Sequence, residues 1–153
     1  MGGTLVLSTL VISVVLLLNQ SSVFVSGLIP GEVTVHMANN LLPTEQELTV
    51  HCQSGDDDLG IQNLPYLADY QFKFHINVGD TTLFFCNFEW LNTTTSDYQT
   101  VSGKYDIYVA KRDEYRCGTY CNWRIQEEGL FSYNDNPDAK YWERLYTWPG
   151  HTI

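Results

Sequence analysis

The chain has 153 residues, of which 44% are hydrophobic, 14% aromatic and 17% charged. Its 8 Lys+Arg against 18 Asp+Glu give a formal net charge of -10, which argues against a nucleic-acid binder and against docking on an anionic membrane, because both need a basic surface. The length predicts one domain.

The first segment predicts a signal peptide. Residues 5–18 are apolar apart from two Ser and one Thr, a run of the length of a signal-peptide h-region and shorter than the roughly 20 residues of a bilayer span. Val25 and Gly27 offer small residues at positions -3 and -1 of a cleavage site before Leu28. We therefore assign residues 1–27 to a removed signal peptide and 28–153 to a secreted domain; an uncleaved membrane anchor is the weaker alternative.

Beyond this segment, apolar and polar residues alternate with a period of two, which is typical of half-buried strands, and helical periodicity is nearly absent. The alternating runs are residues 33–38, 48–53, 70–78, 82–90, 105–109 and 121–125, with shorter candidates at 130–133 and 141–148. Gly, Asp and Asn cluster between the runs, as turns require. The pattern predicts an all-β fold: a single small disulfide-bonded β-sandwich of seven or eight short antiparallel strands, with a small barrel as the alternative.

The turn after Val78 predicts a hairpin between the runs on either side of it. Only a register that pairs Ile76 with Phe84 places the apolar sets of both runs on one face, and register follows the buried face. This register requires a three-residue loop, Gly79–Thr81, or a neighbouring bulge.

The four cysteines predict two disulfides in an oxidising compartment. On an extended strand the Cα atoms of Cys117 and Cys121 would lie roughly 13 Å apart, beyond the span of a disulfide. If the intervening residues are extended, each of the two pairs with Cys52 or Cys86, and both connectivities remain open. A zinc site that adds His51 to these thiols is less favoured, because secretion favours disulfides.

Other candidate groups are interpreted conservatively. Asn92 begins the sequon Asn-Thr-Thr and is predicted to be glycosylated. The run Asp56–Asp58 could bind calcium but is better interpreted as a turn whose carboxylates accept backbone hydrogen bonds. Two further sets are interpreted as separate or solvated residues rather than a metal or catalytic group: His36, His51 and His75, and the carboxylates Glu127, Glu128 and Asp135. The aromatic residues of the tail are assigned to the core rather than to a binding patch: Tyr141, Trp142, Tyr146 and Trp148.

Several ordered motifs resemble those of the plant self-incompatibility S-protein homologues. The segment HCQSGDDDLG from His51 to Gly60 is similar to the family's HC-x-S-x-DDDLG signature, and TLFFCNFEW, ending at Trp90, to its TLFxCxFxW strand. The segment from Cys117 to Gly129 matches its CxxxCxWxI…G pattern, which includes Trp123. The residues of these motifs that we single out, and interpret as structural, are His51, Asp57, Asp58, Leu59, Gly60, Trp90 and Trp123.

The resemblance implies a small secreted plant protein of the apoplast. We expect a monomer that acts by binding and not an enzyme, with no cofactor or metal, because no nucleophile motif is present and every Cys is assigned to a disulfide. The resemblance also implies an extracellular signalling ligand of the self-incompatibility type, which is recognised by a cell-surface receptor. The alternative is a secreted carbohydrate-binding or enzyme-inhibitor module in defence or development. We expect recognition to depend on three loops, because loops on a rigid sandwich carry binding residues: Asp56–Asp69, Asn92–Gly103 and Lys111–Tyr115.

Overall fold

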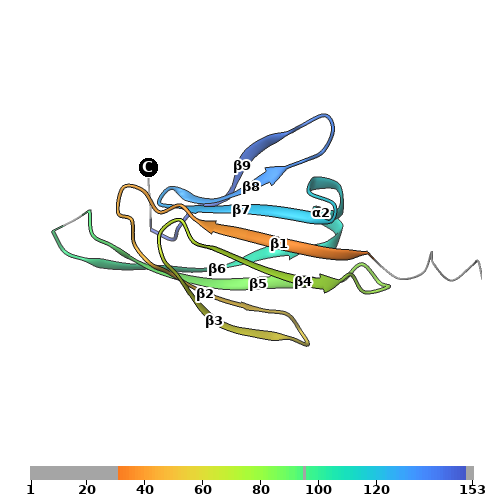
Figure 1. The fold of residues 1–153 in the computed structure, drawn as a ribbon, viewed down its shortest axis with the longest axis horizontal. Helices are drawn as coiled ribbons and strands as arrows, with labels where there is room; N and C mark the ends of the chain where they lie inside the picture. Colours follow the sequence, from red (N-terminus) through yellow and green to blue (C-terminus); the bar gives the residue numbers. More distant parts are fainter. Residues whose placement is uncertain (1–30, 95, 151–153) are drawn as a thin grey trace, which may run out of the picture. The chain divides into compact units, whose positions relative to one another are not determined.

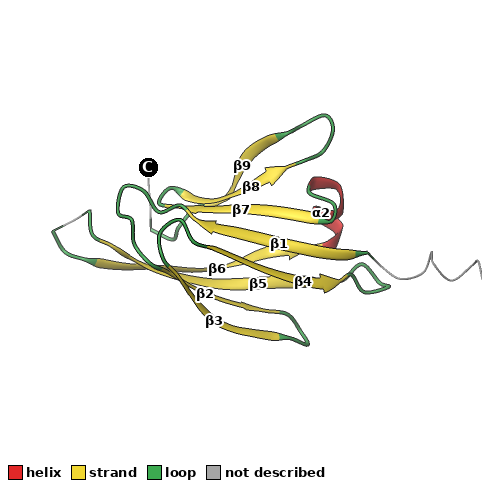
Figure 2. Ribbon diagram, viewed as in Figure 1, coloured by secondary structure: helices red, strands yellow, loops and turns green. Residues whose placement is uncertain are grey.

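Two β-sheets and one short helix make up residues 31–94 and 96–150, which are the residues described by the computed structural model (Figure 1, Figure 2). The elements are β1 (Glu32–Asn39), β2 (Leu48–Gln53), β3 (Asp58–Leu64), β4 (Asp69–His75), β5 (Leu83–Asn92), β6 (Gln99–Val109), α2 (Ala110–Arg116), β7 (Tyr120–Gln126), β8 (Gly129–Asn134) and β9 (Tyr141–Tyr146). The predicted signal peptide lies outside the described residues. None of the helices in the described ranges is long and apolar enough to cross a membrane.

The strands form a five-stranded sheet in the order β4-β1-β7-β8-β9 and a four-stranded sheet in the order β3-β2-β5-β6. The all-β sandwich is thus confirmed, with two differences. The described chain has nine strands rather than seven or eight, and β1 pairs with β7 in parallel. The added strand is β3, an edge strand of which only Leu64 is fully buried, so its sequence does not alternate.

The core lies between the two sheets and takes the inward-facing residues of both. From the five-stranded sheet come Val33, Val35, Met37, Phe72, Cys121, Trp123, Ile125 and Leu130, and from the four-stranded sheet Leu48, Val50, Cys52, Phe84, Cys86, Phe88, Trp90 and Ile107. Ring contacts cross the interface, with the centroids of Phe72 and Phe84 5.1 Å apart. The residues that hold the sheets together are therefore apolar members of the predicted alternating runs.

The predicted hairpin around Gly79–Thr81 is wrong. Strand β4 pairs with β1 in one sheet and β5 pairs with β2 and β6 in the other, so the chain crosses between sheets after His75. The two apolar sets do share one core, but they face each other across it: the ring centroids of Phe74 and Phe84 are 4.5 Å apart. The alternating pattern of β4 and β5 specifies which of their faces is buried. A hairpin buries these faces side by side and two sheets bury them against each other, so the pattern does not distinguish the two arrangements.

The loop between β4 and β5 is closed by a side chain. Oδ1 of Asn77 accepts a hydrogen bond of 2.8 Å from the backbone N–H of Thr81. The backbone N–H of Asn77 donates to Oγ1 of Thr82 at 2.8 Å. Asn is well suited to this position because its short amide can bond the backbone of its own turn.

The predicted disulfide connectivity is also wrong. Cys52 bonds to Cys86, its register partner across β2 and β5, and Cys117 bonds to Cys121. The prediction assumed an extended backbone between Cys117 and Cys121, and this assumption is wrong. Gly118 has φ of 59° and the N–H of Tyr120 donates to the carbonyl of Cys117, so the segment forms a turn. This turn brings the Cα atoms of Cys117 and Cys121 to 5.0 Å, within the range that a disulfide spans.

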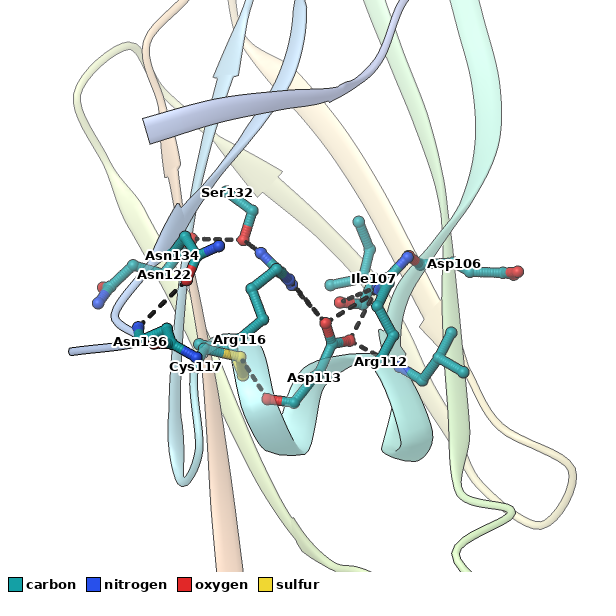
Figure 3. A network of polar contacts seen from close by, with 12 residues as sticks. Asp106, Ile107, Arg112, Asp113, Arg116, Cys117, Asn122, Ser132, Asn134 and Asn136 are labelled. Carbon is teal, nitrogen blue, oxygen red and sulfur yellow. Dashed lines mark hydrogen bonds and ion pairs between the residues drawn. A yellow bond between two sulfur atoms is a disulfide. The ribbon is translucent and has the colours of Figure 1, made fainter. Parts of the chain in front are cut away.

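The helix α2 is held by a buried carboxylate (Figure 3). Asp113 is fully buried; its Oδ1 accepts hydrogen bonds from Nη2 of Arg116 at 2.6 Å and from Nε of Arg112 at 2.9 Å. Its Oδ2 accepts the backbone N–H of Val109 at 2.7 Å. Burial lowers the pKa of Arg112, but the hydrogen bond and the charge of Asp113 outweigh it and raise that pKa above its ordinary value.

The two arginines extend this network to other strands. Arg116 donates to the hydroxyl of Ser132 on β8, while Arg112 donates to the hydroxyl of Tyr146 on β9 at 2.7 Å and to the carbonyl of Asp106 on β6 at 3.0 Å. The network therefore joins the helix to both sheets.

A tryptic digest without reduction tests the disulfide pairing. Cleavage after Arg116 and Arg124 releases residues 117–124 with both of their cysteines. We expect this peptide as a free species two hydrogens lighter than its reduced form, in mass spectrometry before and after reduction. A species that joins it to the peptide of Cys52 or Cys86 would contradict the structure.

Replacing Asp113 tests the buried network. We expect Asp113→Asn to lower the free energy of unfolding by about 3–5 kcal/mol, because it leaves the buried guanidinium of Arg116 without its counter-charge. Denaturant titration measures this loss. Glu114→Gln, which neutralises the exposed neighbour, should change the stability by less than about 0.5 kcal/mol; equal losses in the two variants would show that the network is not the cause.

Candidate functional site

A cleft opens at the end of the sandwich where the β2–β3 turn and the β4–β5 loop lie side by side, on the right of Figure 1. Its volume is about 690 Å³. The turn belongs to the four-stranded sheet, whereas the loop links the two sheets. The cleft therefore exists only once the two sheets have packed together.

The cleft has an aromatic floor and a charged rim. Phe74, Phe84 and Phe85 line it from β4 and β5. Phe84 is buried in the core, whereas its neighbour Phe85 lies on the opposite face of β5, where Nζ of Lys104 is 3.7 Å from its ring centroid. Asp56, Asp57 and Lys73 are the charged residues of its lining, and Nζ of Lys73 is already paired with Oε1 of Glu32 at 2.7 Å. Such a site can accept an apolar side chain of a partner and attract a cation beside it.

The turn that carries these acids is organised by Ser54. Its hydroxyl oxygen accepts the backbone N–H groups of Asp56 at 3.2 Å and Asp57 at 2.9 Å, and its own N–H donates to the carbonyl of Asp57 at 2.8 Å. The carboxylate of Asp56 makes no hydrogen bond to another described residue and is free to meet a partner. Among the described residues, no three or more His, Cys, Asp and Glu side chains group so as to hold a metal ion.

Asp58 instead has a structural partner, in agreement with the interpretation as a turn. Its Oδ1 lies 2.6 Å from Nε2 of His51 and accepts the backbone N–H of Gly60 at 2.9 Å. The hydrogen bond from His51, followed by that from Gly60, lowers the pKa of Asp58 below its ordinary value of 3.8. Gly60 has φ of 72°, which suits a residue without a Cβ.

The other residues of the family motifs lie inside the frame. Trp90 is 2% exposed and Trp123 is 1% exposed, and Leu59 packs against the core. Their positions are those of structural residues, as the sequence predicted, and they contribute no atoms to the cleft floor except Leu59 at its edge.

The three histidines do not come together. His36 lies 3.6 Å from Asp69 on the outer face of the five-stranded sheet, His51 pairs with Asp58 in the other sheet, and His75 lines the cleft. The interpretation as separate residues is thus confirmed.

The candidate carboxylate pair is also divided. Glu127 lies in the β7–β8 turn, where its Oε1 accepts the N–H of Thr44 at 2.8 Å. Asp135 lies beyond β8, where its N–H donates to the carbonyl of Arg116. The two turns are at opposite ends of the sheet (Figure 1), too far apart to act on one bond.

All three predicted recognition loops contain regular secondary structure, so each is corrected. The range Asp56–Asp69 contains all of β3, and Lys111–Tyr115 lies within α2. The range Asn92–Gly103 contains the first residues of β6.

The predicted glycosylation site, Asn92, is only 7% exposed. Its Oδ1 accepts hydrogen bonds from the N–H and the hydroxyl of Thr94. Its glycosylation stays a prediction.

The aromatic tail divides between core and surface. Trp148 is 1% exposed and its indole N–H donates to the carbonyl of Gln126 at 2.8 Å, as predicted for a core residue. Tyr141 is 50% exposed, and Trp142 lies on the outer face beneath the guanidinium of Arg124, so the core assignment is wrong for these two. Their strand β9 is at the edge of its sheet, where neighbouring side chains only partly cover the residues on either face.

Sequence reasoning missed the cleft residues contributed by β4, namely Lys73 and Phe74, because it placed β4 beside β5 in one sheet. A signal was present in Phe85, a large aromatic residue at an outward-facing position of the alternating run.

Comparisons with known proteins agree with the motifs. Residues 34–148 match the family described as plant self-incompatibility protein S1. S-protein homolog 24 of Arabidopsis thaliana is 36% identical over 116 residues, which are 76% of this chain and 67% of that protein. Self-incompatibility protein S1 of Papaver rhoeas is 30% identical over 89 residues, 58% of this chain and 60% of that protein.

A solved structure of a self-incompatibility protein homologue has a similar fold. It superposes with a TM-score of 0.55 at 18% sequence identity and covers 78% of this chain and 96% of that one. It is described as belonging to a widespread family of small, highly stable, secreted proteins from plants.

The pairing of His51 with Asp58 predicts a pH dependence. In His51→Phe we expect the pKa of Asp58, measured by carbon-detected NMR titration, to rise toward 3.8, since its strongest hydrogen bond is lost. The folded-state pKa lies below that of the unfolded chain, about 3.9, so the pair stabilises the fold above about pH 4 and loses this effect as the pH falls through the folded-state value. An unchanged pKa in the variant would contradict the assignment.

Proposed function

Because the chain belongs to the plant self-incompatibility protein S1 family, we propose that it is a small secreted, non-enzymatic signalling ligand of the self-incompatibility type. A cell-surface receptor recognises it in the extracellular space. Residues 1–27 serve as the signal peptide, and the mature domain acts as a monomer. Both disulfides fit this location, since such bonds persist in oxidising compartments.

The observation that carries the proposal is the cleft at the end of the sandwich. Two turns that are distant in the sequence meet there, and a disulfide between β2 and β5 holds the strands behind them. Recognition residues on loops of a rigid scaffold are typical of binding proteins. The free carboxylate of Asp56 beside an aromatic floor offers a receptor both a charge partner and an apolar pocket.

The acidic rim predicts how a receptor would bind. Saturable binding of labelled protein to intact receptor-bearing plant cells gives the affinity at several salt concentrations. We expect the double variant Asp56→Asn/Asp57→Asn to bind about tenfold more weakly and to show a smaller salt dependence, because charges at an interface rim are screened by salt.

The matched control is Glu47→Gln/Glu128→Gln, which removes the same charge from exposed residues that do not line the cleft. They belong to the β1–β2 loop and the β7–β8 turn, which lie at the other end of the sandwich in Figure 1. This control should bind like the parent protein. Equal weakening in both double variants would show that net charge, rather than the cleft, governs binding and would overturn the proposal.

A further inference from the structure

A second hollow lies on the outer face of the five-stranded sheet, away from the core. The pairing of β1 with β7 sets His36 beside Asn122 and Ala38 beside Arg124. The small side chain of Ala38 leaves space between them, and the hollow has a volume of about 370 Å³. The proposed receptor-binding function does not use this surface.

Arg124 is the cation of the hollow and is held in position. Its Cζ lies 4.0 Å from the ring centroid of Trp142, so the guanidinium is stacked on the indole. Arg124 makes no hydrogen bond or ion pair with another described residue, whereas Arg112 and Arg116 are occupied in the buried network. Its in-plane N–H groups are therefore available, and their fork geometry suits a carboxylate.

The charge around the hollow also favours an anion, although the chain as a whole carries -10. Register places Arg124, Phe131 and Arg144 in one row across β7, β8 and β9. The only carboxylate that lines the hollow within the described chain is Asp69, which has His36 3.6 Å away as a partner. Arg124 thus lines the hollow with one paired acid, and Arg144 adds a second positive charge further along the same row.

Three amides line the same hollow: Asn40, Asn122 and Gln126. Their side chains make no hydrogen bonds to other described residues. Each amide can both donate and accept hydrogen bonds. Each hydroxyl group of a sugar also donates and accepts hydrogen bonds, so these amides suit a sugar. The rim adds an exposed apolar side chain, Leu67, against which the C–H face of a ring can pack.

The position of the hollow disfavours an extended peptide. Peptides that bind sheets commonly add a strand to a free edge, but β1 and β7 are interior strands, with neighbours on both sides. Their backbone groups are already paired, so only side chains are offered to a ligand.

From these observations we propose that the hollow binds an acidic saccharide. Arg124 holds the carboxylate of a sugar acid, and the amides of Asn122, Gln126 and Asn40 bond its hydroxyl groups. The carboxylate distinguishes this ligand from a neutral sugar, and the hydroxyl groups distinguish it from an acidic peptide.

Titration with a galacturonic acid trimer tests the proposal, by calorimetry and by amide chemical shifts of the disulfide-bonded protein. We expect saturable binding with shifts concentrated on β1 and β7. Arg124→Gln should weaken binding about tenfold or more, since it removes charge-assisted hydrogen bonds, and Asn122→Ala should weaken it about threefold. Lys111→Gln on α2 removes the same charge from an exposed residue and should leave the affinity unchanged.

Four outcomes would overturn the proposal: no saturable binding, equal weakening in Lys111→Gln and Arg124→Gln, equal affinity for a neutral galactose trimer, or equal affinity for a triglutamate peptide. Melting temperatures of the variants show whether they fold. If Arg124→Gln does not fold, Asn122→Ala and the location of the shifts decide the question. Receptor binding through the cleft can fail or succeed independently of this result.

Discussion

The buried carboxylate of Asp113 is the constraint on which the arrangement of the sheets depends. The chain must leave β6 in one sheet and enter β7 in the other, and it does so through α2, which has only seven residues. A helix this short is not stable by its own backbone hydrogen bonds. Asp113 supplies the missing interactions, because it receives two guanidinium groups and the backbone N–H of Val109.

This arrangement has an energetic consequence. A buried carboxylate is unfavourable unless charges and hydrogen bonds compensate it, and the compensating groups come from the helix itself. Arg116 also lies over the ring of Trp123, with its Cζ 5.2 Å from the centroid. The helix therefore cannot shift without breaking contacts to β7 and β8 as well. Its position in turn fixes the entry of β7 and hence the parallel pairing with β1.

The sequence predicted local properties well and pairings poorly, for a physical reason. Alternation reports whether a side chain is buried, which is why the fold class and the core residues of the central strands were predicted correctly, although Val78, at the end of its run, is 92% exposed. It does not report which strand lies beside another, because many pairings bury the same face. The hairpin of β4 with β5 failed on this point, and the disulfide prediction failed because Gly118 turns a segment that spacing alone treated as extended.

The cleft and the hollow could not be predicted for the same reason, because both depend on which strands are neighbours. The acidic turn at Asp56 was visible in the sequence, but the aromatic floor beside it depends on Phe74 and Phe84 meeting from opposite sheets. Arg124 and Trp142 belong to strands separated by β8, and no local pattern joins them. By contrast, the family motifs were easy to recognise because they describe the frame: Trp90 and Trp123 are buried.

The frame and the surfaces can therefore be considered separately. The buried family residues Trp90 and Trp123 hold the sheets together, whereas Asp56 in the cleft and Arg124 in the hollow are exposed side chains that the core does not require. The cleft lies at one end of the sandwich and the hollow on the outer face of one sheet, and the unpaired charge is a carboxylate, Asp56, in the first and a guanidinium, Arg124, in the second. Under the two proposals, a basic receptor patch and an acidic saccharide would occupy separate surfaces of one small domain, so neither would compete for the site of the other.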